Sequence, residues 1–374
     1  MMRSLLACLL FLPLLALADA PPPPQISAKS WLLLDYQTGQ VIAENNADER
    51  VEPASLTKMM SAYLVEQALT KGQVKPDQVV PVSEHAWKSG GSRMFIEPRK
   101  PVTVDQLLHG VIVQSGNDAT IALAELLAGS EDVFAQMMNR EAQRLGMANT
   151  HFTNSTGWPD KDHYSTARDM ATLAAAVVRD FPEHYAIYAV REYKYNNINQ
   201  QNRNRLLWLD PYVDGIKTGH TEAAGYCLVA SAKRGDRRLI SVVMGTNSEA
   251  ARAQESQKLL NYGFQFYDSV LMYKKDQPVS TLKVWKGAAE TVAAGPAKDL
   301  YLTLPRGEAE KLKAELVSRQ PLLAPIAAGQ EVGTVRVTLD GKPVGEYPVV
   351  ALDNVPEAGF FGRIWDTIRL WFDS

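Results

Sequence analysis

The sequence predicts an α/β fold of the α+β type: a domain that combines an antiparallel sheet with a helical region, then a small all-β domain, then a C-terminal amphipathic helix. The first observation is that strand-like runs are followed by a block of helical runs and then by strand-like runs again. This order implies an antiparallel sheet whose first and last strands come from the two ends of the domain. The second observation is a change after about Phe266 to short alternating segments, and the third is a run of aromatic residues after Pro356.

Length and composition are those of a globular protein. With 374 residues two domains are expected, and a hydrophobic fraction of 46% is ordinary for a chain that buries a sizeable core. The net charge of −3 provides no bulk field that would attract nucleic acid, and two Cys do not make a disulfide framework. The six His residues show no metal-binding spacing, so we expect no metal and no cofactor.

Residues 1–18 are predicted to form a secretory signal peptide. Arg3 supplies the positive charge, and residues 5–17 form an apolar run of 13 positions, which is too short to span a bilayer comfortably. Cleavage after Ala18 is favoured over the alternative after Ala20, because the latter would leave a proline at the new N-terminus. The protein is therefore expected to be exported.

The first domain is predicted over residues 26–268. It begins with a hairpin whose strands lie at residues 30–36 and 41–43. A helix is expected to begin at Ser55 and to end at Gly72. Further helical runs follow at residues 103–114, 117–127, 131–145 and 167–178. Two strands then close the domain, at residues 225–233 and 238–245.

The second domain is predicted to be all-β and to cover residues 275–352. Its segments alternate apolar and polar residues and are separated by Gly, Pro and Asp-Gly turns. Asp340-Gly341, between two alternating runs, is a strong hairpin signal.

The last segment, residues 357–374, is predicted to be an amphipathic helix. One face carries Phe360, Phe361, Ile364, Trp365, Ile368, Trp371 and Phe372, and the other carries Arg363, Asp366, Thr367, Arg369 and Asp373. Such a helix is too short to span a bilayer and is typical of segments that lie in a membrane interface. The alternative is a helix docked on its own protein, which the concentration of aromatic residues at the terminus makes less favoured.

Three short motifs point to nucleophilic catalysis. The first is Ser55-Leu56-Thr57-Lys58, in which Ser55 and Lys58 share one helix face and can form a hydrogen bond. Serine needs a base to remove its proton, and a buried lysine near a second cation, here Lys217, has a lowered pKa and can act as that base. In isolation, this motif would be interpreted as a capping serine with a solvated lysine.

The second motif, Ser115-Gly116-Asn117, follows 60 residues after Ser55, between two helical runs. Ser115 could relay a proton to the leaving group, and Asn117 could orient Lys58 or bind a substrate amide. In isolation, this sequence would be interpreted as a turn with a helix cap.

The third motif, Lys217-Thr218-Gly219, follows 102 residues after Ser115 and precedes a strand at the expected sheet edge. Gly219 would let a substrate backbone approach and pair with that edge, while Lys217 would attract a substrate carboxylate. Arg203 could help to hold the same carboxylate, although a structural ion pair is equally favoured there. For Arg252 the structural ion pair is the favoured interpretation.

In these motifs the chain resembles the low-molecular-mass penicillin-binding proteins, the D-alanyl-D-alanine carboxypeptidase family close to bacterial DacA-type enzymes. The combination of S-x-x-K, S-D-N and K-T-G is typical of penicillin-binding proteins and class A β-lactamases. The resemblance covers almost everything after the signal peptide and includes residues 114–119, 202–208, 213–221 and 359–362.

The resemblance implies a penicillin-binding, β-lactamase-like transpeptidase domain followed by a β-rich domain and a membrane-surface helix. It implies that Ser55 is the acyl-enzyme nucleophile, that Lys58 accepts its proton, and that Ser115 and Asn117 are active-site partners. Lys217 would bind the substrate carboxylate, and the backbone N–H groups of Ser55 and His220 would form the oxyanion hole. The implied partners are the peptidoglycan pentapeptide, β-lactam antibiotics and the cytoplasmic membrane surface.

One departure from the family is visible at Thr156, where some relatives have a His before the Gly, so the role of that imidazole is not carried over.

Other functions with the same motifs are less favoured. A class A β-lactamase needs a Glu-x-x-Leu-Asn element after Ser115, and no such element occurs before Lys217. A non-catalytic wall-binding protein would have lost part of the constellation, which here is complete. A D,D-endopeptidase or transpeptidase role stays open, because the acyl-enzyme chemistry is shared and only the acceptor differs.

Overall fold

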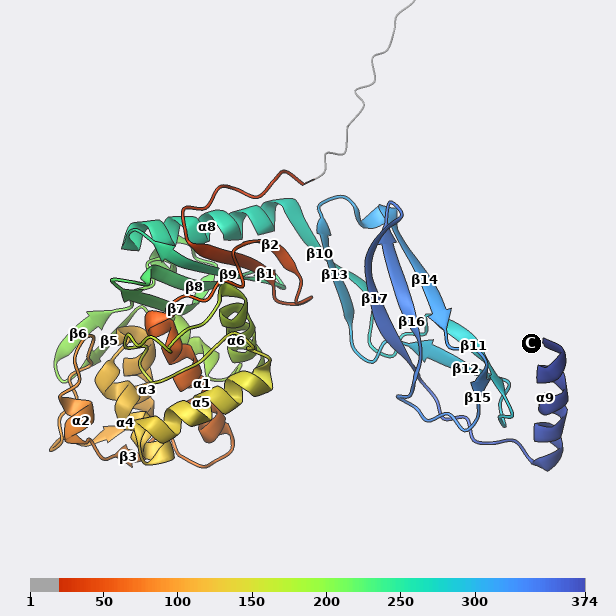
Figure 1. The fold of residues 1–374 in the computed structure, drawn as a ribbon, viewed down its shortest axis with the longest axis horizontal. Helices are drawn as coiled ribbons and strands as arrows, with labels where there is room; N and C mark the ends of the chain where they lie inside the picture. The colour runs from red at the N-terminus through yellow and green to blue at the C-terminus, as the bar shows by residue number, and fades with distance from the viewer. Residues whose placement is uncertain (1–19, 374) are drawn as a thin grey trace, which may run out of the picture.

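The first domain is built on a five-stranded antiparallel sheet. The computed structural model describes residues 20–373, so the predicted signal peptide lies outside the described residues (Figure 1). The strand order is β2-β1-β9-β8-β7, and β1 pairs with β9, which confirms a sheet whose strands come from both ends of the domain. The strands are β1 (Ser30–Asp35), β2 (Val41–Asn45), β7 (Val213–Thr221), β8 (Gly225–Arg234) and β9 (Arg237–Thr246).

The helical region lies between β2 and β7 in the chain. A 3₁₀ turn, η1 (Ala54–Thr57), leads into α1 (Lys58–Thr70), so the helix expected from Ser55 begins as a tighter turn. The run expected at residues 103–114 is split into an α-helix and a π-helical turn. The helical elements are α2 (Glu84–Trp87), α3 (Val104–His109), η2 (Gly110–Gln114, π), α4 (Asn117–Ala128), α5 (Glu131–Leu145), α6 (Ala167–Asp180) and η3 (Tyr185–Ala189).

Short elements complete this region: β3 (Val79–Val80), β4 (Val102–Thr103), β5 (Glu192–Tyr195), β6 (Ile198–Gln201) and α7 (Leu206–Leu209). The β5–β6 hairpin has no counterpart in the sequence-based prediction.

Two hydrophobic cores lie on opposite faces of the sheet. Because side chains alternate along a strand, Leu32 and Leu34 of β1 join the core formed with the helical region, whereas Trp31 and Leu33 face the other way. That second face is covered by α8 (Glu249–Phe266), a helix not predicted from the sequence. Figure 1 shows α8 along one side of the sheet and the helices α1, α3, α4, α5 and α6 on the opposite side.

The second domain contains two antiparallel or mixed sheets. One has six strands in the order β14-β16-β17-β12-β11-β15, and the other is the two-stranded pair β10-β13. The Asp340-Gly341 hairpin is confirmed, since it joins β16 to β17. The elements are β10 (Tyr267–Tyr273), β11 (Ser280–Trp285), β12 (Thr291–Gly295), β13 (Leu300–Pro305), η4 (Ala309–Lys311), β14 (Leu312–Ser318), β15 (Leu322–Leu323), β16 (Glu331–Leu339) and β17 (Lys342–Ala351).

The second domain begins earlier than the predicted start at residue 275. β10 follows α8 directly and pairs with β13, so Val270 packs against the core of the second domain. At the junction, Asp35 accepts hydrogen bonds from Arg237 Nε (3.0 Å) and from Ser269 Oγ (2.5 Å). The hydroxyl of Ser269 therefore links the first strand of the second domain to an ion pair of the first sheet, Arg237–Asp35.

The C-terminal helix, α9 (Phe360–Asp373), follows the second domain as expected. Asp366 on its polar face accepts a hydrogen bond from the backbone N–H of Lys286 (2.6 Å), while Phe361 and Trp371 are 85% and 86% exposed. Within residues 20–373, no helix has the length and hydropathy needed to cross a membrane.

Candidate active site

Ser55 lies in the 3₁₀ turn that precedes α1, rather than in the first turn of the α-helix as predicted. Ala54 before it has a left-handed backbone conformation (φ +48°), so the chain turns sharply and leaves the Ser55 side chain partly exposed. The side chains of Ser55 and Lys58 nevertheless lie on the same side, and Lys58 Nζ donates a hydrogen bond to Ser55 Oγ (3.1 Å). The hydrogen bond expected from the spacing of the motif is therefore present.

Lys58 is fully buried at the start of α1. Besides Ser55, its ammonium contacts the backbone carbonyl of Thr156, to which Nζ donates a hydrogen bond of 2.6 Å. Burial and, to a smaller extent, the positive charge of Arg203 lower the pKa of Lys58 to about 7. The lowered pKa agrees with the prediction. Arg203 is the cation that acts on Lys58, and the expected interaction with Lys217 is also present, because the charge of Lys58 lowers the pKa of Lys217. A substantial fraction of Lys58 is therefore neutral at pH 7 and can accept a proton.

Lys217 and Ser115 form a second hydrogen-bonded pair in the site. Lys217 Nζ donates to Ser115 Oγ (2.8 Å) and to the carbonyl of Thr218 (3.1 Å). Ser115 ends the π-helical turn η2 in a left-handed conformation (φ +62°), which turns its side chain toward β7. The pKa of Lys217 lies well below its usual range. Burial is the largest cause, followed by the positive charges of Lys58, Arg203 and Arg252.

Lys217, Thr218 and Gly219 lie within β7, whereas the sequence analysis placed them before a strand. β7 is the last strand of the sheet, so the predicted position at a sheet edge is confirmed. A Cβ at Gly219 would lie 2.9 Å from the carbonyl oxygen of Pro53 and 3.2 Å from the nitrogen of Leu56. Gly219 is thus needed for the close packing of β7 on the turn that carries Ser55.

Asn117 makes no hydrogen bond to Lys58 in the structure and instead holds a neighbouring loop. Its backbone N–H donates to the carbonyl of Ser92 (2.7 Å), and its Nδ2 donates to the carbonyl of Gly90 (2.8 Å). The adjacent carboxylate of Asp118, which sequence reasoning did not single out, accepts hydrogen bonds from the backbone N–H groups of Met94, Phe95 and Ile96. The start of α4 therefore shapes one wall of the site.

A cavity of about 240 Å³ lies beside Ser55 and contains most of the predicted binding residues. His220 is exposed, and its ring contacts that of Tyr226 in a tilted arrangement with a centroid distance of 4.0 Å. The lining residues include Ser55, Ser92, Ser115, Arg203, Thr218, Gly219, His220, Tyr226, Glu249 and Arg252. The structure therefore brings Ser55, Ser115, Arg203 and residues 218–220 together around one opening.

Arg252 belongs to this site, although the sequence analysis favoured a structural role. It is 3% exposed, and its guanidinium donates to the carbonyls of Gly219 (3.3 Å) and Arg203 (3.4 Å). It comes from α8, the helix missing from the prediction, so the sequence offered no way to place it beside β7. Two guanidinium groups and Lys217 make this end of the cavity suited to a carboxylate.

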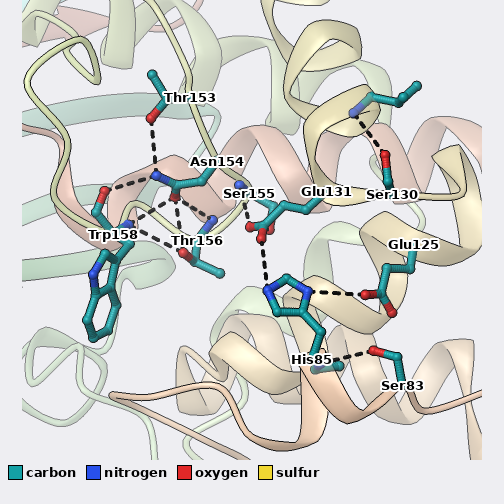
Figure 2. A network of polar contacts seen from close by, with 12 residues as sticks. Ser83, His85, Glu125, Ser130, Glu131, Thr153, Asn154, Ser155, Thr156 and Trp158 are labelled. Carbon is teal, nitrogen blue, oxygen red and sulfur yellow. Dashed lines mark hydrogen bonds and ion pairs between the residues drawn. The ribbon is translucent and has the colours of Figure 1, made fainter.

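The segment of residues 153–158, shown in Figure 2, supplies the Thr156 carbonyl that contacts Lys58. The Oδ1 atom of Asn154 accepts hydrogen bonds from the backbone N–H groups of Thr156 (3.2 Å), Gly157 (2.8 Å) and Trp158 (3.0 Å). Ser155 donates from its N–H and its Oγ to Glu131 at the start of α5. These contacts position the Thr156 carbonyl that accepts the hydrogen bond from Lys58.

The geometry is that of a serine enzyme that transfers acyl groups. A serine hydroxyl, a buried lysine of lowered pKa and a cationic cavity within one opening are the parts that such chemistry needs. Over residues 20–373, no group of three or more His, Cys, Asp or Glu side chains is placed to hold a metal ion.

Comparisons with known proteins agree with this class. A family model described as D-alanyl-D-alanine carboxypeptidase matches residues 17–248, and a model of the penicillin-binding protein 5 C-terminal domain matches residues 267–357. The chain is 46% identical over 363 residues to D-alanyl-D-alanine carboxypeptidase DacC of Escherichia coli (strain K12), an alignment that covers 94% of this chain and 91% of DacC. It is also 46% identical to DacA of the same strain over 360 residues, covering 94% of this chain and 89% of DacA.

Among solved structures, penicillin binding protein 5 from Haemophilus influenzae matches with a TM-score of 0.88 and 41% identity, covering 90% of this chain and 100% of that one. The chain therefore belongs to the D-alanyl-D-alanine carboxypeptidase family and is a serine hydrolase.

Proposed function

We propose that this D-alanyl-D-alanine carboxypeptidase removes the terminal D-alanine from the pentapeptide stems of peptidoglycan through an acyl-enzyme on Ser55. The observation that carries the proposal is the hydrogen bond from Lys58 to Ser55, made by a buried lysine whose pKa is lowered to about 7. The test is to incubate the purified protein with a pentapeptide stem and to measure released D-alanine. Failure to release D-alanine from any such peptide would contradict the proposal.

The bond changes follow from the positions of the side chains. Neutral Lys58 takes the proton of Ser55, and Ser55 Oγ attacks the carbonyl carbon of the penultimate D-alanine. The backbone N–H groups of Ser55 and His220 stabilise the oxyanion of the tetrahedral intermediate. The C–N bond then breaks, and the proton that Lys58 took from Ser55 passes to the leaving amine through Ser115, whose Oγ accepts a hydrogen bond from Lys217. Neutral Lys58 then takes a proton from water, whose oxygen attacks the ester carbonyl. The ester C–O bond breaks, Ser55 Oγ takes the proton back from Lys58, and the shortened peptide leaves with a free carboxylate.

The substrate carboxylate binds at the cationic end of the cavity. Lys217, Arg203 and Arg252 supply the positive charge, and Thr218 supplies a hydroxyl next to them. The substrate backbone pairs with the free edge of β7, which has no further strand beside it among the described residues. Asn117 acts by holding the loop at residues 90–92 and by offering its amide to the substrate.

β-Lactam antibiotics are the second class of ligand, since they acylate the same serine. Support comes from a relative with 28% sequence identity, Penicillin-Binding Protein D2 from Listeria monocytogenes, which was solved in an ampicillin-bound form. A transpeptidase role stays an alternative, because the 28% identical Streptomyces K15 protein is described as a DD-transpeptidase. An assay that adds an acceptor amine separates the two, because a transpeptidase forms a new peptide in place of free acid.

We also propose that the protein is periplasmic and anchored to the outer face of the cytoplasmic membrane by α9. The predicted signal peptide directs export, and the exposed side chains of Phe360, Phe361, Trp365 and Trp371 provide the apolar surface that an interfacial helix inserts. The polar face of α9 is held to the second domain by Asp366. The aromatic side chains are therefore available to lipid while the helix stays attached to the protein.

A further inference from the structure

His163 is a buried histidine directly beneath the turn that carries Ser55, and the mechanism above does not use it. Its side chain is packed against the ring of Phe152, and 3% of the residue is exposed. Nε2 lies 2.8 Å from Thr57 Oγ1, and Nδ1 lies 3.0 Å from the backbone nitrogen of Thr153. One imidazole therefore contacts both the nucleophile's turn and the beginning of the segment at residues 153–158.

The contacts fix which nitrogen carries the proton. A backbone N–H can only donate, so the Thr153 N–H makes Nδ1 an acceptor without a proton. The ring proton is then on Nε2, which donates to Thr57 Oγ1. Protonation of Nδ1 would place two N–H donors against each other and break the hydrogen bond from the Thr153 backbone, so that the Thr153 hydroxyl, 3.2 Å from Nδ1, would have to accept instead.

The two contacts end in the two segments that carry the partners of Lys58. Thr57 lies between Ser55 and Lys58 in sequence, and Thr153 begins the segment whose Thr156 carbonyl accepts the 2.6 Å hydrogen bond from Lys58. We propose that His163 is a positioning residue for acylation, which holds the Ser55 turn and the Thr156 carbonyl in register around the ammonium of Lys58. This proposal rests on Lys58 acting as the base for Ser55.

The surroundings of His163 favour the neutral ring that this role requires. Burial is the first cause that lowers the pKa of His163, to about 4; Asp160 opposes the shift, while His151 and Lys58 reinforce it. The charged and titratable groups that act on the ring are therefore Asp160 and His151 from its own loop and Lys58 from α1. The ring is neutral throughout the pH range in which Lys58 changes its charge.

Two substitutions separate the two contacts. In His163→Asn, the side-chain oxygen can replace Nδ1 as acceptor for Thr153, but the contact with Thr57 is lost. In His163→Gln, the longer amide can reach Thr57, but the acceptor for Thr153 is lost. Thr57→Val removes the same hydroxyl contact from the other side with little change in shape. His151→Gln serves as a control, because His151 is on the same loop but is exposed and contacts the carbonyl of Asp162.

The measurement is the rate constant of acylation by a fluorescent β-lactam between pH 5 and 9, in protein shown to be folded by circular dichroism. We expect each His163 variant to acylate about 10–100-fold more slowly, because small displacements of reacting groups are costly. The midpoint of the pH profile should move upward as water reaches Lys58. His163→Asn and Thr57→Val should not add in the double variant, and His151→Gln should match the wild type.

The proposal is overturned if His163→Asn and Thr57→Val keep the wild-type rate and midpoint, or if their losses multiply in the double variant. If His163→Asn does not fold, the acylation rate and pH midpoint of Thr57→Val alone test the proposal, because the same changes are expected in both variants. Acylation at the wild-type rate in Lys58→Ala would instead overturn the proposed function, so the two failures are distinguishable.

Discussion

Gly157 faces the carbonyl oxygen of Ala54 with no space for a side chain: a Cβ at Gly157 would lie 1.8 Å from that oxygen. Gly157 also has a left-handed backbone (φ +81°), and Ala54 on the other side of the contact has one too (φ +48°). Two unusual backbone conformations thus meet immediately before Ser55. The segment that binds Lys58 and the turn that presents the nucleophile are packed backbone against backbone.

Gly157→Ala should therefore destabilise the protein and slow acylation. Gly72→Ala is the matched control, because Gly72 also has a left-handed backbone (φ +68°) but has no atom within 4 Å of a Cβ. The control should lose about 1–2 kcal/mol from backbone strain alone. Urea unfolding should show a larger loss for Gly157→Ala, and equal losses in the two variants would mean that the contact with Ala54 relaxes freely.

Ser55→Ala should abolish both D-alanine release and covalent labelling by a β-lactam, because no other group in the cavity is placed to form the acyl-enzyme. The measurement is gel fluorescence after incubation with a fluorescent penicillin, followed by a D-alanine assay. Labelling that survives in this variant would show that the nucleophile is a different residue. Ser92→Ala, which changes another serine of the same cavity, is the control and should still be labelled.

Lys58→Ala should slow acylation by about 10²–10⁴-fold, the usual contribution of a positioned base. In the wild type, the lysine must be neutral to accept a proton and its pKa is about 7, so the acylation rate should rise about tenfold per pH unit below pH 7 and level off above it. Stopped-flow acylation over this range checks both points. Lys71→Ala, an exposed lysine at the end of α1, should leave the profile unchanged.

Arg252→Gln should raise the KM for peptides that end in a free carboxylate. A charge-assisted hydrogen bond is worth about 1.5–3 kcal/mol, which corresponds to roughly 10–100-fold in binding. A peptide with an amidated C-terminus should show little difference between the variant and the wild type. The exposed Arg140→Gln is the control, and an equal effect on both peptides would assign Arg252 to packing alone.

Truncation after Asn354 should release the protein from membranes while keeping its activity on small peptides. The removed residues contain α9, whose apolar side chains each contribute on the order of 1 kcal/mol or more at an interface. Fractionation of cells that express each form, followed by the D-alanine assay, gives the result. A truncated protein that remains in the membrane fraction would place the anchor elsewhere, with an uncleaved signal segment as the first suspect.

Strongly periodic segments were predictable from the sequence. The helix at residues 131–145 and the hairpin at Asp340-Gly341 follow directly from spacing and turn chemistry. α8 was missed because its buried side includes Arg252, Glu255 and Ser256, which break the apolar pattern on which helix prediction depends. Because Arg252 lies on α8, its position in the active site was not predicted either.

The site was predictable in its composition and only partly in its geometry. Ser55, Lys58, Ser115 and Lys217 were found from three motifs and are adjacent in the structure. The left-handed conformation of Ser115 depends on tertiary contacts that no local pattern reports. The same holds for the Thr156 carbonyl, because a backbone group carries no sequence signature.

The position of β7 at the end of its sheet has a consequence for drug resistance. An unpaired strand edge recognises a peptide by its backbone amides, which are the same in every stem and which a compact bicyclic amide can imitate. A substitution that prevents an antibiotic from binding at this edge would equally prevent the cell-wall peptide from binding there. Variants that escape inhibition are therefore expected to hydrolyse the acylated Ser55 faster. Their relative affinity for the antibiotic and the peptide at the β7 edge should hardly change.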